Sequence, residues 1–403
     1  MENVLIIVVL ENSERIEELI KNIREIRPDL MVLKKTLNEV DFPTLNFTHT
    51  IILDADLPKS EIVEFINNLN ADFPSIFKFL WADGTKPFHL KQILSEIHGG
   101  QPACLWKQQS EAVIADTICR MVFFSDWIRF KQINVVLSQM RDIPTVPFVY
   151  LRVLNLLNDI NTDAEDIASC LSEDPSLCAM ILKLANSAII GLREPVSSPF
   201  EAVMQLGVER IKAFVLSSRF AFQFDQQKIP WFSIERFWKH SMFTASYARQ
   251  IAIDKTRDTK LADASFTAGI LHDVGVLLIA SNKPEEFKEI ISTAISNHTS
   301  LRFAEKSVLG FTHAELAGCL LCLWGIPLSI LEAIAAHHNP QSCFSKEFSP
   351  LTAVHIANAF ANEKSFDNYC PGDSSVDNDY LTDLGCVSEI EGWKNLCFNS
   401  EVI

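Results

Sequence analysis

The stretch EDPSLCAMILKLANSAIIG, residues 173–191, sets the pattern for the larger part of this chain. Asp174 and Pro175 open it with helix-start chemistry, because an aspartate accepts hydrogen bonds from the first backbone amides and proline fits the first helical position. Leu177, Ile181 and Leu184 then recur at helical spacing and form one apolar face. Helical periodicity continues almost throughout the residues beyond about 110. The sequence therefore predicts an all-α fold for this part.

The first hundred residues follow a different pattern. Apolar runs that suit buried strands alternate with amphipathic stretches, in the order VLIIVVL, SERIEELIKNIREI, MVLKKT, HTIILDADLP, EIVEFINNLN and IFKFLWADG. Strands that alternate with helices favour a parallel sheet covered by helices. We predict a multi-domain chain with an α/β domain over 1–105, a connector helix over 106–140, an all-α domain over 141–362, and an acidic, loosely packed C-terminal extension over 363–403.

The composition limits the classes of partner. The chain has 403 residues, 48% of them hydrophobic, and a formal net charge of -16 at pH 7. Such a chain can bury large cores, and its charge argues against a nucleic-acid partner because phosphate binding needs clustered lysine and arginine. The ten cysteines have no regular spacing and indicate buried thiols in a reducing compartment. The run VLIIVVL is too short to span a membrane, so we expect a cytoplasmic protein.

Asp54 is the first candidate functional residue. It directly follows the apolar run of HTIILDADLP, and Pro58 comes four residues later. This arrangement resembles the receiver domain of bacterial response regulators, in which a phosphorylated aspartate ends the third strand before a similarly placed proline. The resemblance implies a flavodoxin-like fold, a phosphoacceptor at Asp54, and acids at the end of the first strand, where Glu11 is the candidate. Trp81 stands where the family has a small hydroxyl residue, so the domain is degenerate.

Two interpretations of the aspartates remain open. Asp54 and Asp56 could simply cap the end of a strand, as loop aspartates commonly do, or Asp54 could accept a phosphoryl group. Lys86-Pro87-Phe88 is similar to the lysine-proline-phenylalanine of a receiver's fifth strand, but it follows the fourth strand too soon for a helix and a strand to intervene. A degenerate receiver used for dimerisation or protein contact is the expectation.

Several motifs of the second part resemble one family in combination. The stretch at 173–191 is followed by PVSSPFEAVMQLGVERIKAFVLSS, and the other motifs are IPTVP at 143–147, FWKHS at 237–241, AGILHDVG at 268–275, FTHAELAGCLLCLWGIP at 311–327, AIAAHHNP at 333–340 and VHIANAF at 354–360. Together they resemble the HDOD domain, an output module related to the HD-type phosphohydrolases, from about residue 135 to 362. The resemblance implies an HD-type helical bundle.

The HD relationship also implies a metal site that this chain retains only in part. The positions that match metal ligands of HD phosphohydrolases are His240, His272, Asp273, His313, His337 and His338. Asn358 replaces the late aspartate, and Val276 replaces the lysine of the catalytic cyclic-dinucleotide phosphodiesterases. A single histidine on an apolar helix is usually a core residue, but six matching positions favour a divalent metal, namely Zn, Fe, Ni, Mn or Mg. His298 and His355 match no ligand position.

The predicted function is signalling by contact. We expect a bacterial cytoplasmic protein whose HDOD domain binds a protein partner or a small ligand, and which can form a homodimer. A first alternative is a metal-dependent phosphohydrolase acting on a nucleotide or cyclic dinucleotide, although Asn358 and Val276 weaken it. A second alternative is a response regulator controlled by phosphorylation of Asp54.

Overall fold

The structure is a computed structural model that describes the chain between residues 3 and 399 with gaps. The described segments are 3–8, 14–46, 48–73, 76–83, 87–94, 96–97, 102–127, 133, 136–137, 140, 148–157, 162–190, 192, 194–224, 229–230, 232–324, 326–343, 347–364 and 375–399. Contacts divide the chain into two compact units, one made of 1–138 with 319–328 and the other of the remaining residues. We describe each unit by itself.

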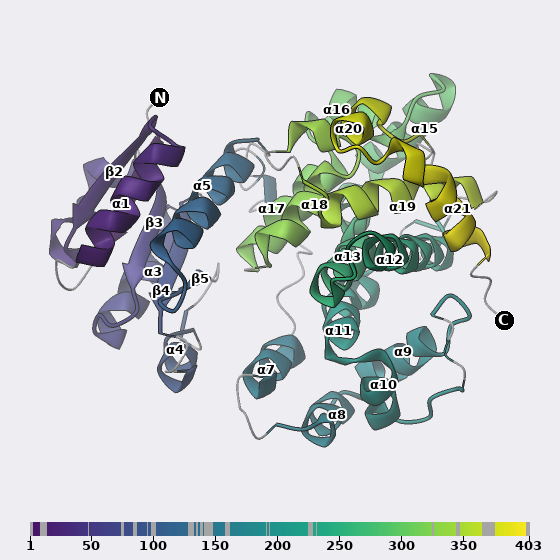
Figure 1. The fold of residues 1–403 in the computed structure, drawn as a ribbon, viewed down its shortest axis with the longest axis horizontal. Helices are drawn as coiled ribbons and strands as arrows, with labels where there is room; N and C mark the ends of the chain where they lie inside the picture. Colours follow the sequence, from purple (N-terminus) through teal and green to yellow (C-terminus); the bar gives the residue numbers. More distant parts are fainter. Residues whose placement is uncertain are drawn as a thin grey trace. The chain divides into compact units, whose positions relative to one another are not determined.

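The N-terminal unit contains a parallel sheet (Figure 1). Its strands are β1 (Asn3–Val8), β2 (Leu30–Lys35), β3 (Thr48–Asp54), β4 (Phe77–Ala82) and β5 (Ala103–Trp106), in the spatial order β2-β1-β3-β4-β5. The helices are α1 (Glu14–Ile26), α2 (Phe42–Leu45), α3 (Lys59–Asp72), α4 (Pro87–Leu94) and α5 (Glu111–Trp127). The predicted alternation of strands and helices with a parallel sheet is confirmed.

Alternate residues of the central strands build the core on one face of this sheet. Ile51 and Leu53 of β3 and Leu80 of β4 are completely buried with Ile62 and Ile66 of α3. Successive strand residues point to opposite faces, so Ile51 and Leu53 of β3 lie on the same face and both enter this core. The last residue of β3 is Asp54, at the carboxyl edge of the sheet, where parallel α/β folds place their functional groups.

The end of this unit differs from the prediction. The fifth strand is Ala103–Trp106, whereas Pro87 begins α4 and Lys86 lies outside the described residues. The helix predicted as a connector contains α5, which packs along α1 and joins it through an ion pair between Arg15 and Glu111. The contacts therefore divide the chain near residue 138, beyond the predicted end of the α/β domain at 105.

The second unit is helical in the part of the chain that the structure describes, and Figure 1 shows its helices in teal, green and yellow. From residue 148 onward the helices are α7 (Phe148–Leu157), α8 (Ala164–Ser172), α9 (Pro175–Ala185), α10 (Pro199–Leu206), α11 (Val208–Gln223), α12 (Ile234–Thr256), α13 (Thr259–Leu271), α14 (Val274–Asn282), α15 (Pro284–Ser296), α16 (Leu301–Leu309), α17 (His313–Leu323), α18 (Leu328–Ala336), α19 (Pro350–Lys364), α20 (Asn378–Asp383) and α21 (Ile390–Asn399). The contacts assign the last part of α17 and the first residue of α18 to the first unit. The IPTVP motif at 143–147 lies outside the described residues.

The predicted helix start at 174 is confirmed. The Asp174 carboxylate accepts hydrogen bonds from the backbone N–H groups of Ser176 and Leu177, both at 3.0 Å, and Pro175 is the first helical residue. Leu177 and Ile181 are buried, while Leu184 is only half-buried.

Three helices form the centre of the second unit. α12 and α13 lie side by side, and α19 packs against both. Gly269 of α13 permits this approach, because a Cβ at this position would lie 2.5 Å from the Cα of Ala245 on α12. The run Thr259–Asn282 is long and apolar enough to span a membrane by length and composition, but 89% of its most apolar window is buried inside the fold. Burial of this extent is typical of a core helix.

The C-terminal extension is packed, and the expectation of a loose tail is wrong for residues 375–399. Tyr380 and Trp393 are each only 1% exposed to solvent. The Trp393 indole N–H donates to Asp254 on α12 at 3.1 Å. The acidic composition that suggested a mobile segment belongs to the exposed side of α20 and α21, whereas widely spaced apolar residues fix the other side.

Candidate metal centre

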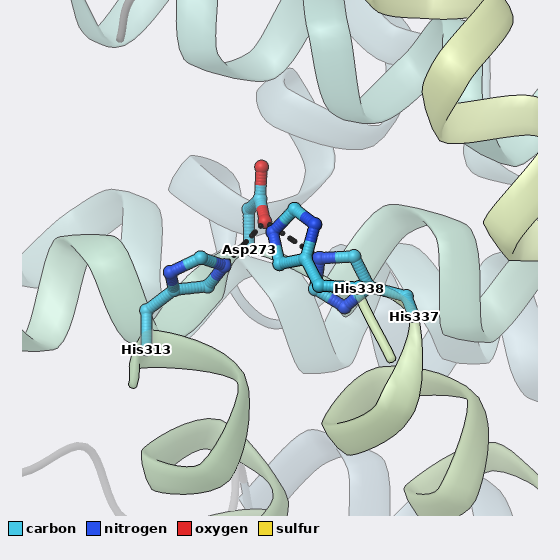
Figure 2. A group of neighbouring side chains, drawn as sticks. All are labelled: Asp273, His313, His337 and His338. Atoms are coloured by element: carbon cyan, nitrogen blue, oxygen red, sulfur yellow. Dashed lines mark ion pairs between the residues drawn. The ribbon is translucent and has the colours of Figure 1, made fainter. Parts of the chain in front are cut away.

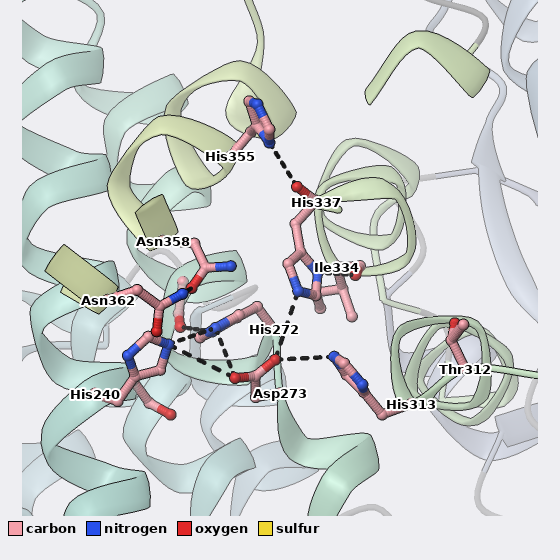
Figure 3. A network of polar contacts seen from close by, with 12 residues as sticks. His240, His272, Asp273, Thr312, His313, Ile334, His337, His355, Asn358 and Asn362 are labelled. Atoms are coloured by element: carbon pink, nitrogen blue, oxygen red, sulfur yellow. Dashed lines mark hydrogen bonds and ion pairs between the residues drawn. The ribbon is translucent and has the colours of Figure 1, made fainter. Parts of the chain in front are cut away.

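All six predicted metal ligands lie in one cluster built from helix ends (Figures 2 and 3). They are His240 on α12, His272 and Asp273 between α13 and α14, His313 at the start of α17, and His337 and His338 after α18. Their ligand atoms form two groups, each within 4.8 Å, and Asp273 belongs to both. The histidines of the first group are His240 and His272, and those of the second are His313, His337 and His338.

Close backbone contact positions the turn between α13 and α14. Asp273 is the N-cap residue of α14, but its carboxylate makes no capping hydrogen bond and points into the cluster instead. Gly275 follows, and a Cβ there would lie 2.0 Å from the backbone oxygen of His313. Only glycine lets α14 begin this close to α17, so Gly275 sets the separation between Asp273 and His313.

The Asp273 carboxylate faces imidazoles with both oxygens (Figure 3). Oδ2 lies 3.0 Å from Nε2 of His272 and 3.7 Å from Nε2 of His240. Oδ1 lies 3.1 Å from Nε2 of His313 and 3.5 Å from Nε2 of His337. One carboxylate therefore lies between two pairs of histidines, as a bridging ligand does in a two-metal site.

Two of these imidazoles are oriented by backbone carbonyl groups. The Nδ1–H of His272 donates to Gly269 at 2.8 Å, and the Nδ1–H of His337 donates to Ile334 at 2.7 Å. A carbonyl oxygen can only accept, so Nδ1 must carry the hydrogen in both rings. The other ring nitrogen, Nε2, faces Asp273 in both rings.

The third imidazole is oriented by a buried acid. Glu305 of α16 is fully buried and accepts hydrogen bonds from the Nδ1–H of His313 at 2.7 Å and from its backbone N–H at 2.9 Å. Metal-binding histidines typically donate their second ring N–H to a carboxylate or carbonyl, which fixes ring and tautomer. The part of Glu305 in positioning His313 was not predicted from the sequence.

The ring nitrogens that face Asp273 fit a metal ion. Nε2 of His313 and Nε2 of His337 are buried, and neither has a hydrogen-bond partner within the described part of the chain. Their approaches to Asp273 meet the distance of an ion pair but not the angle of a hydrogen bond. Buried polar atoms without partners are costly, and a metal ion that replaces the proton of His313 would satisfy both nitrogens.

The protonation states of the histidines also fit a metal site. Burial and the neighbouring His272 lower the pKa of His240 to about 4, and burial lowers the pKa of His337 to about 4. These rings are neutral at pH 7 and can donate lone pairs. Burial opposes the charge on His313, but Glu305 and Asp273 outweigh it and raise the pKa of His313 to about 10. This proton must leave when a metal binds.

The acid of the cluster is ionised. Burial raises the pKa of Asp273, but the surrounding histidines, His272 first, outweigh burial and hold that pKa well below its ordinary value. His338 is half-buried, and burial together with His337 keeps its pKa well below its ordinary value. At neutral pH the cluster therefore offers one carboxylate, the neutral imidazoles of His240, His337 and His338, and the imidazolium of His313.

Two positions weaken the catalytic side of the site. Asn358 on α19 is buried beside His240 and accepts a hydrogen bond from Asn362 at 3.2 Å, so it offers only a neutral amide oxygen where HD enzymes have a carboxylate. Val276 on α14 is fully buried, and an alkyl side chain cannot supply the charge of the lysine it replaces. The site thus has its histidine ligands and Asp273, but Asn358 and Val276 stand in place of the aspartate and the lysine of catalytic relatives.

The remaining histidines named in the sequence lie outside the cluster. Nδ1 of His355 donates to the backbone oxygen of His337 at 2.7 Å, and Nε2 of His355 accepts from the backbone N–H of Asp377 at 2.8 Å. Both ring nitrogens are used, so His355 cannot also bind a metal. His298 is exposed in a left-handed backbone conformation with φ of 50°.

The candidate phosphoacceptor lies in the N-terminal unit. Asp54 ends β3, and its carboxylate accepts a hydrogen bond from Nζ of Lys107, the residue after β5, at 2.5 Å. Lys107 also donates to Asp56 at 2.7 Å. Glu11 lies outside the described residues. The sequence analysis missed Lys107, although the short apolar run Ala103–Trp106 before it has the form of a strand.

Lys107 and Trp81 define the environment of Asp54. Burial lowers the pKa of Lys107, but hydrogen bonds to Asp54 and Asp56 outweigh burial, so that pKa lies above its ordinary value. The ammonium of Lys107 and the guanidinium of Arg15 lie 5.5 and 5.6 Å from the centre of the Trp81 ring, within the range of cation–π attraction. The large indole occupies the place predicted for a small hydroxyl residue.

The second unit is thus a helical domain with a buried His-Asp cluster between helix ends. The model of the HDOD domain family matches residues 143–340. Residues 143–340 are therefore an HDOD domain. An uncharacterised protein of Treponema pallidum (strain Nichols) is 24% identical over 230 residues, which are 56% of this chain and 43% of that protein. This chain thus spans less than half of that relative's length.

Solved structures share the fold. An HDOD domain protein from Geobacter sulfurreducens is 23% identical with a TM-score of 0.51, over 68% of this chain and 89% of that one. A protein provisionally named for signal transduction, from Marinobacter aquaeolei VT8, is 17% identical with a TM-score of 0.54, over 85% and 81%. A protein provisionally named a phosphohydrolase, from Shewanella amazonensis SB2B, is 23% identical with a TM-score of 0.50, over 65% and 93%.

Proposed function

We propose that this chain is a bacterial cytoplasmic signalling protein whose HDOD domain holds a divalent transition metal and acts by binding a protein partner or small ligand. One observation carries the proposal. Three imidazoles, those of His272, His313 and His337, are each anchored through Nδ1 and present Nε2 to the Asp273 carboxylate. Such an arrangement is typical of metal sites, and the Nε2 atoms of His313 and His337 have no hydrogen-bond partner among the described residues.

The donor set selects the class of metal. Imidazoles outnumber carboxylates in the cluster, and imidazole suits zinc, iron and nickel, whereas magnesium prefers oxygen ligands and retained water. His240, His272 and Asp273 would hold one ion, and Asp273 with His313, His337 and His338 would hold a second. A bound ion would supply Lewis acidity and, where exposed, a position for an anionic ligand.

The residues around the cluster favour binding over hydrolysis. Val276 leaves this position without an ammonium group near Asp273, and Asn358 supplies no negative charge to the first metal position. The protein's own groups therefore bind and orient a ligand, whereas proton transfer to a leaving group has no partner at these two positions.

Elemental analysis by inductively coupled plasma mass spectrometry tests the metal. The purified full chain should contain close to stoichiometric zinc, iron or nickel, and the double variant His272→Ala/Asp273→Ala should lose it. His298→Asn is the matched control, since it removes an exposed histidine and asparagine tolerates the left-handed backbone. Equal metal in all three proteins, or none in the wild type after zinc addition and dialysis, would contradict the proposal.

The bridging position of Asp273 favours one alternative, a metal-dependent phosphohydrolase acting on a nucleotide or cyclic dinucleotide. Two ions held by the two groups of ligands would supply the Lewis acidity that activates water against a phosphoester. The metal-loaded chain should be offered bis(p-nitrophenyl) phosphate and cyclic dinucleotides, with the double variant as control. Turnover that depends on Asp273 would establish this alternative, and binding without turnover supports the contact mechanism.

We infer for the N-terminal unit a degenerate receiver that serves in dimerisation or protein contact. The strand order β2-β1-β3-β4-β5 is the flavodoxin-like order, and Lys107 at the end of β5 reaches Asp54 at the end of β3. Reaction with acetyl phosphate and intact-protein mass spectrometry should show no phosphoryl adduct, because the end of the first strand offers Glu11 as the single candidate acid for the magnesium that phosphoryl transfer needs. An adduct lost in Asp54→Asn would instead establish a phosphorylation-controlled regulator.

A further inference from the structure

Residues 375–399, which we name the C-terminal clamp, lie beyond the region matched by the HDOD family and contact helices that carry candidate metal ligands. α21 packs on α12, the helix of His240, through the indole of Trp393 and the carboxylate of Asp254. An ion pair between Lys255 and Glu389 adds a second attachment to α12. The clamp is thus fixed to an element of the metal centre.

The clamp also contacts α19, through α20 and the residue that caps it. The hydroxyl groups of Tyr380 on α20 and Thr352 on α19 are hydrogen-bonded at 2.8 Å, and both residues are buried. Asp377 caps α20 by accepting from the backbone N–H of Tyr380 at 2.9 Å, and its own backbone N–H donates to Nε2 of His355 at 2.8 Å. This last bond fixes the tautomer of His355 with the hydrogen on Nδ1.

His355 passes this constraint to His337. Its Nδ1–H donates at 2.7 Å to the backbone oxygen of His337, which lies just past the end of α18 (Figure 3). The last carbonyl groups of a helix have no partner within the helix and need one from elsewhere. The chain of contacts therefore runs from the clamp through His355 to the backbone of a candidate ligand whose ring faces Asp273.

We propose that the C-terminal clamp is a positioning element of the metal centre, so that docking of the clamp and binding of metal strengthen each other. Asp377 and His355 act through His337 and touch no metal themselves. This inference rests on the proposed metal site. By thermodynamic linkage, whatever factor the docked clamp adds to metal affinity, the metal adds to the docking of the clamp.

A pair of substitutions at one residue separates the hydrogen bond from the cap. Asp377→Pro removes both the backbone N–H and the carboxylate, and the φ of -77° at this position suits proline. Asp377→Ala removes only the carboxylate and is the matched control. Zinc affinity, measured on the full chain against a competing chelator, should fall about tenfold further in Asp377→Pro than in Asp377→Ala.

A second measurement needs no metal. In metal-free protein, hydrogen–deuterium exchange of the amides of residues 337–339 should be faster in Asp377→Pro than in Asp377→Ala. Without the bond from Asp377, His355 holds the carbonyl of His337 less firmly, so the end of α18 opens more often. Equal exchange in the two variants would overturn the clamp whether or not zinc binds. Zinc binding by the wild type with equal affinities in the two variants would also overturn it. Absence of zinc binding in the wild type, with unequal exchange, would refute only the proposed metal and its linkage.

Discussion

Gly275→Ala offers the sharpest test of how the metal centre is assembled. The new Cβ would lie 2.0 Å from the backbone oxygen of His313, 2.7 Å from its carbonyl carbon and 3.0 Å from its Cα. Since ordinary contact begins at 3.4 Å, the start of α17 must move away from α14 by about 1.4 Å. Backbone cannot rotate out of the way as a side chain can, so His313 moves with it.

The expected losses follow from this displacement. Overpacking of a well-packed core costs about 1–3 kcal/mol in the free energy of unfolding. Metal–ligand distances tolerate only about 0.2 Å, so a displaced His313 ceases to be a good ligand, and we expect zinc affinity to fall at least about tenfold. Urea unfolding and zinc titration against a chelator measure the two effects on the same protein.

Gly392→Ala is the matched control for this prediction. Gly392 is exposed on α21, and a Cβ there would meet no atom within 4 Å. Alanine is the better helix former, so this variant should gain about 0.5–1 kcal/mol in the free energy of unfolding and keep its zinc affinity. Equal zinc affinity in Gly275→Ala and Gly392→Ala would refute the argument that close contact between α14 and α17 positions His313.

Three further predictions concern stability. Burial lowers the pKa of Lys78 on β4 to about 8, so folding releases its proton between about pH 8 and 10.5. At pH 7 the buried charge destabilises the fold, and Lys78→Met should raise the free energy of unfolding by about 3 kcal/mol. Urea titrations in which this gain does not shrink by about pH 10.5 would contradict the prediction. The side chain of Asn186 forms hydrogen bonds with the backbone N–H and the backbone oxygen of Val196, both at 2.8 Å. Asn186→Ala should lower the free energy of unfolding, measured by thermal unfolding, by about 2 kcal/mol. A loss near zero would show that these two bonds do not stabilise the connection between α9 and α10. Trp393→Phe removes the indole donor to Asp254 and should cost about 1 kcal/mol, while faster exchange of the amides of α21 would locate the effect.

Much of the candidate site was predicted from the sequence because the HDOD motifs name the ligand positions. The six ligands come together as the resemblance implied. The positioning groups around them could not be predicted, because Glu305, Gly275 and His355 have no signal in spacing or composition that marks a partner. Their roles depend on which backbone atoms lie within a few ångströms after folding.

The N-terminal unit shows the same limit. The spacing argued against a fifth strand at Lys86-Pro87-Phe88, but no strand was predicted at Ala103–Trp106, which is short and weakly marked. Lys107 contacts a residue 53 positions earlier in the chain, and only the order of the parallel strands brings their carboxyl ends to one edge. Local sequence signals carry no information about such a distance.

The sequence by itself determined the alternation of strands and helices, the helical second part, the capped start of α9 at Asp174 and the chemical types of the ligands. These features depend on periodicity, capping and side-chain chemistry, which act over a few residues. Only the tertiary structure decided which ring nitrogens face Asp273, that Lys107 engages Asp54, and that residues 375–399 pack on the HDOD domain. The reason is physical: these contacts join residues far apart in the chain, and their geometry is set by how whole helices and strands pack.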